Sequence, residues 1–532
     1  MKPRLQLFAF EDTPALIQKV SEILSELTEV PWQVDSQQHV TLYECCEHAF
    51  RLGARSIVIQ RRVFDPDFLA EFNAYYSRLF AHSSRDCARL HFFKQKPVAL
   101  SDPLRFLDTE ALPVGYCGFI TLRPVGRTPV AATFLVPGEG GGNIRCLDEF
   151  PVHLGGIKLR VVGTPFMQQD NAVGACAQAS IWMALRTMRK REGDRAFDPA
   201  QISGEATRFS TVTRILPNRE GLTDGQMLHA VRGTGYSPHL IWLSTAPSDE
   251  DKKREELRLA KHKISIYLDS EIPVLLALYS TSGHAVVAIG YTFTNTPTNA
   301  VTNVNDSRSI TGVAVPIAYT TSWIQELIIH NDNSGPYLRL PDCTNPAKRG
   351  YALEQADIAI PLLPTDVFLT GEEAMQVGLG AWDEVLIDLT ATLANHDKIA
   401  FAERFALRLL LLDRRHARSW GRDNAPATDL ASEMRLADLP RRVWALEIHL
   451  KDEVGKHATE AARSMIGFIL IDPTGDVHPN SVLVTYLNLP MVTDEQHGAM
   501  VVARPAKSFQ IPPLGLLPPF RAIHGHAAPF GA

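Results

Sequence analysis

The spacing of hydrophobic and polar residues over the first 155 positions predicts both helices and strands. Between 12 and 27, apolar side chains recur every three or four positions behind Asp12, which is a suitable helix N-cap. Strands are predicted where β-branched and aromatic residues concentrate, at 56–64, 115–125 and 128–137. The mixture of the two patterns predicts an α+β unit over 1–155.

The pattern changes from about residue 156 onward. Residues 175–191 place apolar side chains along one stripe and basic residues in the last turn, which predicts a buried helix. Segments 271–279 and 284–291 are continuous apolar runs and predict neighbouring strands. Between 294 and 312 the chain is rich in Thr and Asn without a helical period, so we expect an exposed insertion there.

The last third of the chain again mixes the two patterns. Helices are predicted at 371–394 and 398–420, followed by strands at 442–450, 464–472 and 481–489. The tail over 505–532 is rich in Pro, Gly, Ala and His and is expected to be poorly packed. We therefore expect three units: an N-terminal α+β domain of unknown role over 1–155, a central domain over 156–360 and a C-terminal α+β domain over 361–532.

Composition narrows the class of protein. At 532 residues the chain is too long for one hydrophobic core, and its net charge of −6 gives no reason to expect nucleic acid or an anionic membrane as partner. We find no apolar run of about 18 residues and no signal-peptide pattern, so a cytoplasmic protein is expected. The seven cysteines form neither a disulfide framework nor a C-x-x-C pair, so no metal and no cofactor are expected.

One cysteine and one histidine stand in a context that suits chemistry. Cys176 has small neighbours and opens the predicted helix, where unpaired N–H groups favour a thiolate and a developing oxyanion. His284 lies where a polar turn becomes an apolar strand, a position that can present an imidazole to a cleft. We therefore consider Cys176 as a nucleophile and His284 as its base, although a packed cysteine and a core histidine are the simpler interpretation of each alone.

A third group should orient the imidazole by accepting a hydrogen bond from its other nitrogen. Asp332 is preferred, because it follows an apolar strand and precedes a turn in the segment 323–340. Asn331 and Asn333 are close rivals, since an amide oxygen can also accept this bond. Such residues also cluster in ordinary turns for local reasons.

With these residues in view, the central segment resembles the papain-like cysteine peptidases. The order Cys, His, Asp, with the cysteine opening a helix and the histidine in GHAVVAIGY, is similar to that fold. The resemblance is closest to the bacterial branch that includes the double-glycine leader peptidases. It extends over about 160–340, where GLTDGQMLHAVRGTGYSP, DSEIPVLLALYSTSGHAVVAIGY and HNDNSGPY occur in the same order. It implies a central helix packed on an antiparallel sheet that carries the histidine and the acid.

The resemblance also implies roles for individual residues. Cys176 corresponds to the nucleophile, His284 to the general base and acid, and Asp332 to the orienting group, with Asn331 as the alternative. A glutamine before the cysteine usually donates to the oxyanion in this fold. Gln169 is the better match, with Gln168 and Asn171 as alternatives, although Gln169 lies seven residues before the cysteine, one more than usual.

The expected activity is hydrolysis of peptide or amide bonds through a thioester, with a protein or peptide as substrate. Two alternatives remain open at this point. The same residue order serves acyl transfer to amines of the transglutaminase or arylamine acetyltransferase kind. The shifted Gln169 also keeps open a binding or scaffold protein whose papain-like domain has lost catalysis. The flanking domains could bind a regulatory protein partner.

Overall fold

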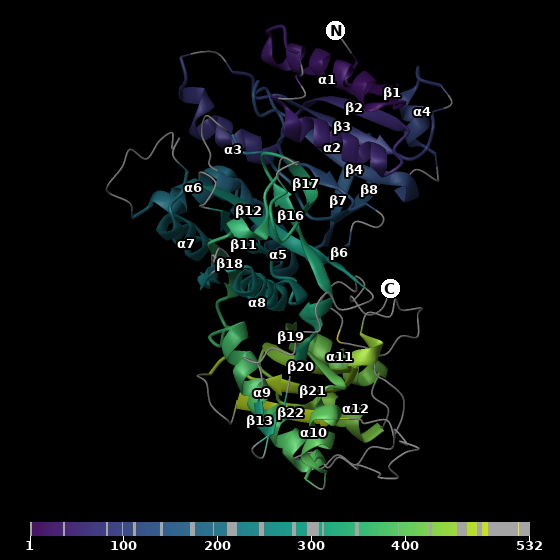
Figure 1. Cartoon of the computed structure of the whole chain (residues 1–532). Helices are drawn as coiled ribbons and strands as arrows, with labels where there is room; N and C mark the ends of the chain where they lie inside the picture. The colour runs from purple at the N-terminus through teal and green to yellow at the C-terminus, as the bar shows by residue number, and fades with distance from the viewer. Residues whose placement is uncertain are drawn as a thin grey trace.

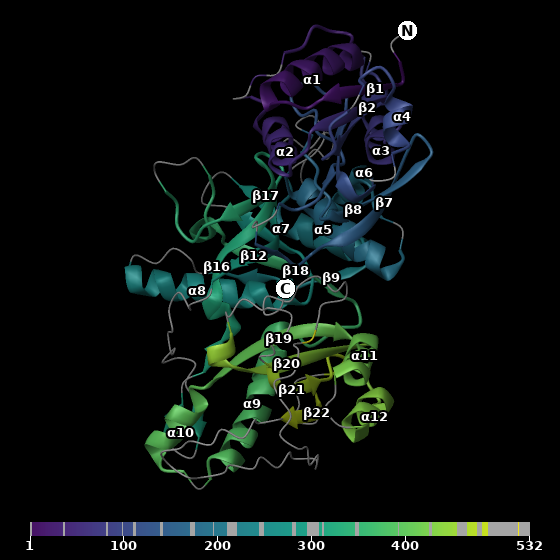
Figure 2. The same cartoon turned by 90° about the vertical axis from the view of Figure 1, so that its right-hand side faces the viewer.

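A computed structural model describes residues 3–487 and Phe520, apart from short gaps. The gaps are 34, 36–37, 81–82, 98, 110–112, 139–141, 171–175, 195, 210–220, 244–248, 279–282, 295–307, 311–312, 316, 346–349, 392, 425–427, 455–464 and 476–480. The chain builds three units along its length, with the N-terminal unit at one end and the C-terminal unit at the other (Figures 1 and 2).

The N-terminal unit is an antiparallel sheet with helices on it. Its strands lie in sequence order: β1 (Leu5–Ala9), β2 (Ser56–Val63), β3 (Cys87–Phe93), β4 (Tyr116–Leu122) and β5 (Phe134–Leu135). The helices are α1 (Thr13–Thr28), α2 (Val40–Arg51), α3 (Pro66–Ala74) and α4 (Pro103–Leu107), with short 3₁₀ turns at Tyr76–Arg78 and Pro113–Gly115. Asp12 caps α1 by accepting from the N–H of Ala15 at 2.8 Å, as predicted.

The passage from the first unit to the second is not a simple linker. β6 (Asn143–Ile144) pairs with a strand of the central sheet, whereas the hairpin of β7 (Asp148–Leu154) and β8 (Ile157–Gly163) packs its apolar face against the first sheet. The two units therefore interleave around position 155: β6, before it, belongs to the central sheet, whereas β8, after it, packs on the first sheet.

The central unit is an antiparallel sheet with the main-path order β10-β18-β11-β12-β16-β17, and with β6 and β9 attached at its sides. Its strands are β9 (Tyr236–Pro238), β10 (Ile241–Trp242), β11 (Val274–Leu278), β12 (His284–Phe293), β16 (Ile324–Asn331), β17 (Gly335–Leu340) and β18 (Ile358–Pro364). β11 and β12 pair in antiparallel register, with Leu278 opposite His284. The two apolar runs predicted as neighbouring strands are thus confirmed as neighbours.

Four helices accompany this sheet: α5 (Cys176–Glu192), α6 (Pro199–Thr207), α7 (Asp224–Gly233) and α8 (Glu250–Asp269). Helix α5 packs against β11 and β12, and its residues Ile181, Trp182 and Leu185 are fully buried. Thr223 caps α7 in a capping box with Gln226. Helix α8 lies between the central sheet and the C-terminal unit, in contact with both (Figure 1).

The connection between β12 and β16 is more than the exposed loop expected from its Thr/Asn content. It contains the hairpin of β13 (Arg308–Ile310) and β14 (Val313–Val315), then β15 (Ala318–Tyr319) and a 3₁₀ turn at Thr320–Trp323. β13 and β14 lie against helices of the C-terminal unit, and β15 pairs in parallel with its first long strand. Much of the predicted insertion, including 295–307, lies outside the described residues.

The C-terminal unit is a second five-stranded sheet in the order β15-β19-β20-β21-β22. Its own strands are β19 (Phe405–Asp413), β20 (Arg442–Leu450), β21 (Met465–Ile471) and β22 (Val482–Leu487). The helices are α9 (Gly371–Leu389), α10 (Asn395–Ala402), α11 (Arg414–Asn424) and α12 (Thr428–Leu436), with a 3₁₀ turn at Lys451–Glu453; a further 3₁₀ turn, at Leu353–Gln355, precedes β18 in the central unit. The three strands predicted last along the chain are confirmed as β20, β21 and β22.

The prediction of one helix over 398–420 was wrong. The segment contains a helix, a nine-residue strand and a second helix, because its leucines at 407–412 are covered on both faces of the sheet. A strand buried on both faces reads as a continuous apolar run, which has no period to distinguish it from a buried helix. The tail lies outside the described residues except for Phe520, which is buried against Trp420 and Phe468.

The fold is therefore mixed α+β with antiparallel sheets, as expected at that level. No helix in the described part of the chain is both long enough and apolar enough to cross a membrane.

Candidate active site

Cys176 is the first residue of α5 and lies beside the start of β12. Its Sγ accepts a hydrogen bond from the backbone N–H of Ala285 at 3.3 Å, across 109 residues of sequence. The side chain is half-buried, whereas Cys45, Cys46, Cys87, Cys117 and Cys146 are buried and Cys343 is exposed. Cys176 is thus the one described cysteine that is partly accessible and placed beside a histidine-bearing strand.

His284 opens β12 and is held by Asn331. Its Nε2 lies 3.0 Å from Oδ1 of Asn331 at the end of β16, and the same oxygen accepts from the N–H of Asn333 at 3.0 Å. An amide oxygen is only an acceptor, so Nε2 carries the proton and Nδ1 keeps a lone pair. Gly283, with φ of +74°, provides the left-handed backbone that turns the chain into the strand. Nδ1 of His284 lies 3.5 Å from Nδ2 of Asn333, which can donate to it, so the geometry fits a neutral imidazole that accepts at Nδ1.

Asp332, the preferred orienting residue, is a neighbour of His284 rather than its hydrogen-bond partner. Its Oδ1 lies 3.7 Å from Nε2 of His284, and the residue is fully buried. Neither carboxylate oxygen makes a well-formed hydrogen bond with the described residues. Burial raises the pKa of Asp332 to about 8, although the backbone N–H groups of Gln169 and Asn333 act in the opposite direction. Asp332 is therefore mostly neutral at pH 7, and Asn331 holds the imidazole.

The three oxyanion candidates have different surroundings. Nε2 of Gln169 donates to Oδ1 of Asn333 at 2.9 Å, so this side chain reaches the turn that carries Asn331. Oε1 of Gln168 is buried and accepts from the N–H of Val130 at 3.2 Å, which is a structural role. Asn171 lies outside the described residues. The sequence therefore identified a glutamine of this site, but its amide is committed to Asn333.

The electrostatic setting favours the uncharged forms of the pair. Burial raises the pKa of the Cys176 thiol to about 11, and the charge of Asp332 acts in the same direction. The N–H groups of Ala285, Ala177 and Cys176 itself oppose this rise by stabilising the thiolate. Burial also lowers the pKa of His284, against the hydrogen bond with Asn331. At neutral pH the site contains a thiol and a neutral imidazole.

Tyr351 is a member of the site that the sequence did not indicate. Its ring stacks on the imidazole of His284, with centroids 4.9 Å apart and planes at 26°. Burial raises the pKa of Tyr351, and the negative forms of Asp332 and Cys176 act in the same direction. The residue stands in a stretch of loop without a recognisable motif, so no sequence signal marked it.

A buried arginine of the N-terminal unit holds the segment that precedes the cysteine. Arg123 is fully buried, and one of its terminal nitrogens donates to the carbonyl oxygens of Gln168 and Gln169 at 2.9 and 3.1 Å. Its other terminal nitrogen meets Glu71 at 3.1 Å. The hydroxyl of Tyr76 donates to Asp170, the next residue of the same segment. The N-terminal unit thus fixes the approach of the chain to Cys176.

A second contact joins α3 of the N-terminal unit to α5. The carboxylate of Asp67 accepts from Nε1 of Trp182 at 3.2 Å and pairs with Arg186, both on α5. Burial raises the pKa of Asp67 to about 6, and Arg186 opposes that rise. The helix that begins with the cysteine is therefore held by the sheet on one side and by the N-terminal unit on another.

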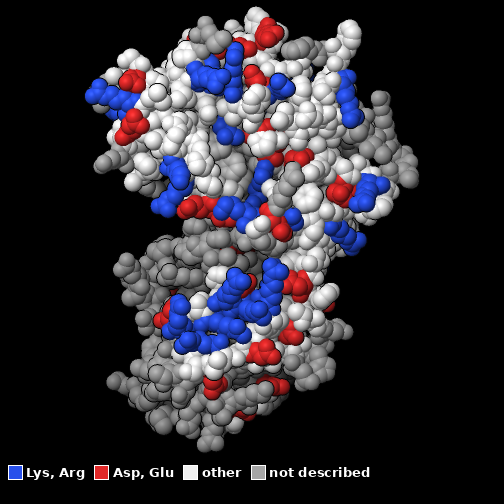
Figure 3. All heavy atoms as spheres, turned by 180° about the vertical axis from the view of Figure 1, so that it is seen from behind, with Lys and Arg blue, Asp and Glu red and all other residues white. Residues whose placement is uncertain are grey.

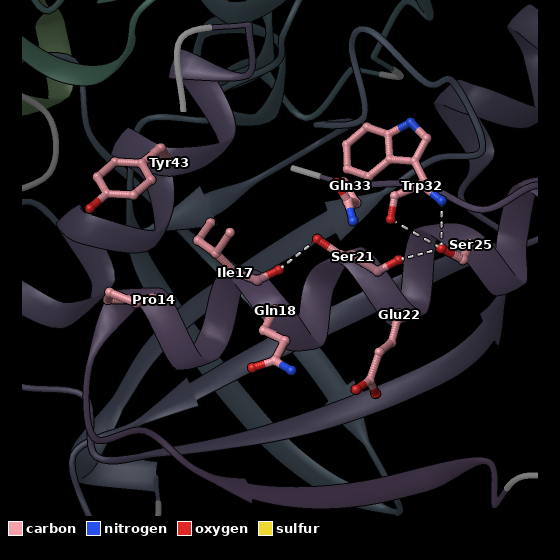
Figure 4. Close-up of a pocket in the computed structure, with 9 residues that line it drawn as sticks. All are labelled: Pro14, Ile17, Gln18, Ser21, Glu22, Ser25, Trp32, Gln33 and Tyr43. Carbon is pink, nitrogen blue, oxygen red and sulfur yellow. Dashed lines mark hydrogen bonds between the residues drawn. The ribbon is translucent and has the colours of Figure 1, made fainter. Parts of the chain in front are cut away.

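The other described features add no further chemistry here. Within the described residues, no three His, Cys, Asp or Glu side chains are grouped so as to hold a metal ion. A surface hollow of about 540 Å³ lies along α1, where Ile17, Trp32 and Tyr43 are among the lining residues (Figure 4). Its Ser25 hydroxyl accepts from the N–H of Trp32 at 2.9 Å, so local polar groups satisfy one another.

Comparison with family models and with curated proteins assigns no function to the site. No family model matches the chain, and no curated protein is significantly similar to it.

Proposed function

We propose that the protein is a thiol hydrolase of the cysteine peptidase type, with Cys176 as nucleophile and His284 as base. The observation that carries the proposal is the assembly of the two from separate elements. Sγ of Cys176 accepts from the residue after His284, and the imidazole is oriented by an amide oxygen on a third element. A nucleophile, a base and an orienting group in this arrangement are the parts that covalent acyl chemistry requires.

The proposed reaction follows from the protonation states. As Sγ attacks the acyl carbon, Nδ1 of His284 takes the thiol proton, so neither group needs a charge at rest. The N–H groups of Cys176 and Ala177 at the start of α5 favour negative charge beside the sulfur. His284 then gives its proton to the departing amine, leaving a thioester on Cys176. Water attacks the thioester, with His284 again taking a proton, and the acid product leaves with regeneration of the thiol.

A peptide library tests this proposal and separates its alternatives. The full chain is incubated with proteome-derived peptides, with and without a biotinylated primary amine, and the products are identified by mass spectrometry. We expect new peptide termini with the wild-type chain and with Cys343→Ala, an exposed-cysteine control, and none with Cys176→Ala or His284→Ala. Cleavage that survives Cys176→Ala contradicts the proposal.

The same experiment addresses the two alternatives. Biotin incorporation in place of new termini indicates amine transfer. A wild-type chain that neither cleaves nor transfers, but retains peptides in a pull-down as Cys176→Ala does, indicates a binding protein. A protein or peptide is the expected substrate in either enzymatic case.

A further inference from the structure

A cavity of about 410 Å³ lies between the central unit and the C-terminal unit, away from Cys176. Met188 of α5, Ile272 just before β11 and Pro364 at the end of β18 contribute apolar surface from the central unit. The end of β19, the start of α11 and the start of β20 line it from the C-terminal unit. Its volume falls within the range of roughly 300–1,000 Å³ that is common for small-molecule sites.

The C-terminal side of this cavity is strongly basic. Arg414, Arg415, Arg441 and Arg442 all line it. Asp413, the single carboxylate of the lining, accepts from the backbone N–H of Arg415 at 2.8 Å and so caps the start of α11. Arg442 pairs with Asp366, which stands outside the lining. Four guanidinium groups against these two carboxylates leave an excess of positive charge.

Two of these arginines are available to a ligand. Arg415 and Arg441 are exposed, and their guanidinium groups make no hydrogen bond or ion pair with any residue in the described ranges. The guanidinium of Arg414 makes a long hydrogen bond of 3.4 Å with the carbonyl oxygen of Leu439. Blue side chains gather on the corresponding face of the C-terminal unit, just beside the junction of the units (Figure 3). Such a cluster repels itself until an anion neutralises it.

We propose that this cavity binds a phosphorylated small molecule of nucleotide size. The guanidinium groups of Arg415 and Arg441 hold the phosphates, for which their planar array of donors is well suited. The apolar part of the ligand lies against Met188, Ile272 and Pro364. A ligand bound in this way bridges two units of the chain.

The site is separate from the proposed active site. Met188 is twelve residues along α5 from Cys176, roughly 18 Å at the rise of an α-helix. The ligand therefore touches the helix that carries the cysteine without reaching its sulfur. Nothing in this proposal depends on peptidase activity, so the two are tested independently.

Isothermal titration of the full chain at 150 mM salt tests the proposal. The probes are ATP, GTP, CTP and UTP one at a time, with adenosine and a 20-base-pair DNA duplex as comparisons. We expect at least one nucleotide to bind at one site per chain, and adenosine to bind at least tenfold more weakly than ATP. The double variant Arg415→Ala/Arg441→Ala is expected to weaken nucleotide binding at least tenfold.

Arg422→Ala is the matched control, because Arg422 lies on the same helix, is exposed, and pairs with Asp423 outside the cavity. It should bind the nucleotide within twofold of the wild type. The proposal is overturned if none of the four nucleotides binds, if the double variant binds unchanged, or if adenosine binds as tightly as ATP. It is also overturned if the duplex binds more tightly than every nucleotide, or if Arg422→Ala weakens binding as much as the double variant. Thermal unfolding without ligand verifies that each variant is folded.

Discussion

At the scale of single residues, the site combines a half-buried thiol with a histidine whose tautomer is set by its neighbour. Oδ1 of Asn331 accepts a hydrogen bond from Nε2–H of His284, and this leaves Nδ1 as the nitrogen that can act as a base. The charge of Asp332 disfavours the Cys176 thiolate, but its carboxylate is held in a site that disfavours ionisation. The two residues therefore have separable effects, one on geometry and one on pH.

Removing the orienting amide should damage the reaction more than removing the acid. We expect Asn331→Ala to lower kcat at least about tenfold, because Nε2–H of His284 loses its acceptor and the ring loses its orientation. Asp332→Asn should keep kcat within a few-fold near pH 7, where Asp332 is already mostly neutral. Steady-state kinetics on a cleaved library peptide measure both. A larger loss of kcat in Asp332→Asn than in Asn331→Ala would indicate that Asp332, not Asn331, orients the imidazole.

The resting thiol should be slow to alkylate at neutral pH. With a thiol pKa near 11 and a lowered pKa of His284, we expect no ion pair at acidic pH and an iodoacetamide rate at Cys176 that rises steadily from pH 7 to 10. Asp332→Asn should increase the rate above pH 8, because it removes a charge that disfavours the thiolate. Mass spectrometry of each cysteine measures the rates, with exposed Cys343 as internal reference. A rate plateau near pH 6 would instead indicate a thiolate–imidazolium pair at rest.

Asp332 should also make stability depend on pH. Its pKa in the folded chain, about 8, lies above the ordinary value of roughly 4 in an unfolded chain. The folded state therefore binds the proton more tightly, and stability from this group is complete below about pH 4 and is lost as pH rises through 8. We expect Asp332→Asn to gain stability over the wild type between pH 5 and 9, on the order of a few kcal/mol. Urea unfolding at both pH values checks this; a difference that does not change with pH contradicts it.

At the scale of elements, the turn before the cysteine is held from outside its own unit. Arg123 reaches the carbonyl oxygens of Gln168 and Gln169 from the end of β4, and its partner Glu71 is also buried. Burial raises the pKa of Glu71 to about 8, against the attraction of Arg123. Arg123 therefore serves two purposes: it partners the buried Glu71 and it holds the segment that precedes Cys176.

Replacing Arg123 should lower the stability of the folded chain. We expect Arg123→Met to destabilise the chain by about 3–5 kcal/mol, because it leaves the buried Glu71 carboxyl group and the carbonyl oxygens of Gln168 and Gln169 without their hydrogen-bond donor. Adding Glu71→Gln should recover part of the loss. Arg160→Ala, which breaks an exposed pair with Glu149, is the control and should change stability by less than about 1 kcal/mol. Urea unfolding measures all three, and a loss in Arg123→Met no larger than in the control contradicts the role.

The sequence predicted the helices and strands better than the long-range contacts between them. Periodic apolar residues located α1 and α5, and continuous apolar runs located β11 and β12. The same kind of run was mistaken for a helix at β19, because β19 is buried on both faces of its sheet and so shows no alternation of apolar and polar residues. The Cys176 and His284 pair stood in short motifs and was visible. Arg123 and Tyr351 were not, since the site residues that they contact are 45 or more residues away along the chain and no local pattern records such contacts.

At the scale of the whole molecule, a buried set of charges joins the central and C-terminal units. Asp269 at the end of α8 meets Arg408 of β19 at 3.0 Å, and Arg408 meets Glu447 of β20 at 3.1 Å. Burial opposes the charge of Asp269, but Arg408 and Arg145 together lower its pKa below the ordinary value. All of these groups are buried, so each depends on the others for compensation.

Breaking this network should loosen both units at once. We expect Arg408→Met to lower the opening free energy of amides in β11, β12, β19 and β20 by about 3–5 kcal/mol, because Asp269 and Glu447 each lose a buried positive partner. Hydrogen exchange followed by mass spectrometry resolves the strands separately. Arg422→Ala, which breaks an exposed pair, should leave all four unchanged. Faster exchange confined to β19 and β20 would show that the units are energetically independent.

The distance along the chain between Asp269 and Arg408 has a consequence for synthesis. The ribosome adds Asp269 139 residues before Arg408, and at about 5–20 residues per second this interval is roughly 7–28 s. During that time Asp269 has Arg145 but not Arg408 as a counter-charge, and β15, once synthesised, still awaits β19, the strand with which it pairs. The contacts that join α8 and β15 to β19 therefore form only after synthesis has passed Asp413, the last residue of that strand.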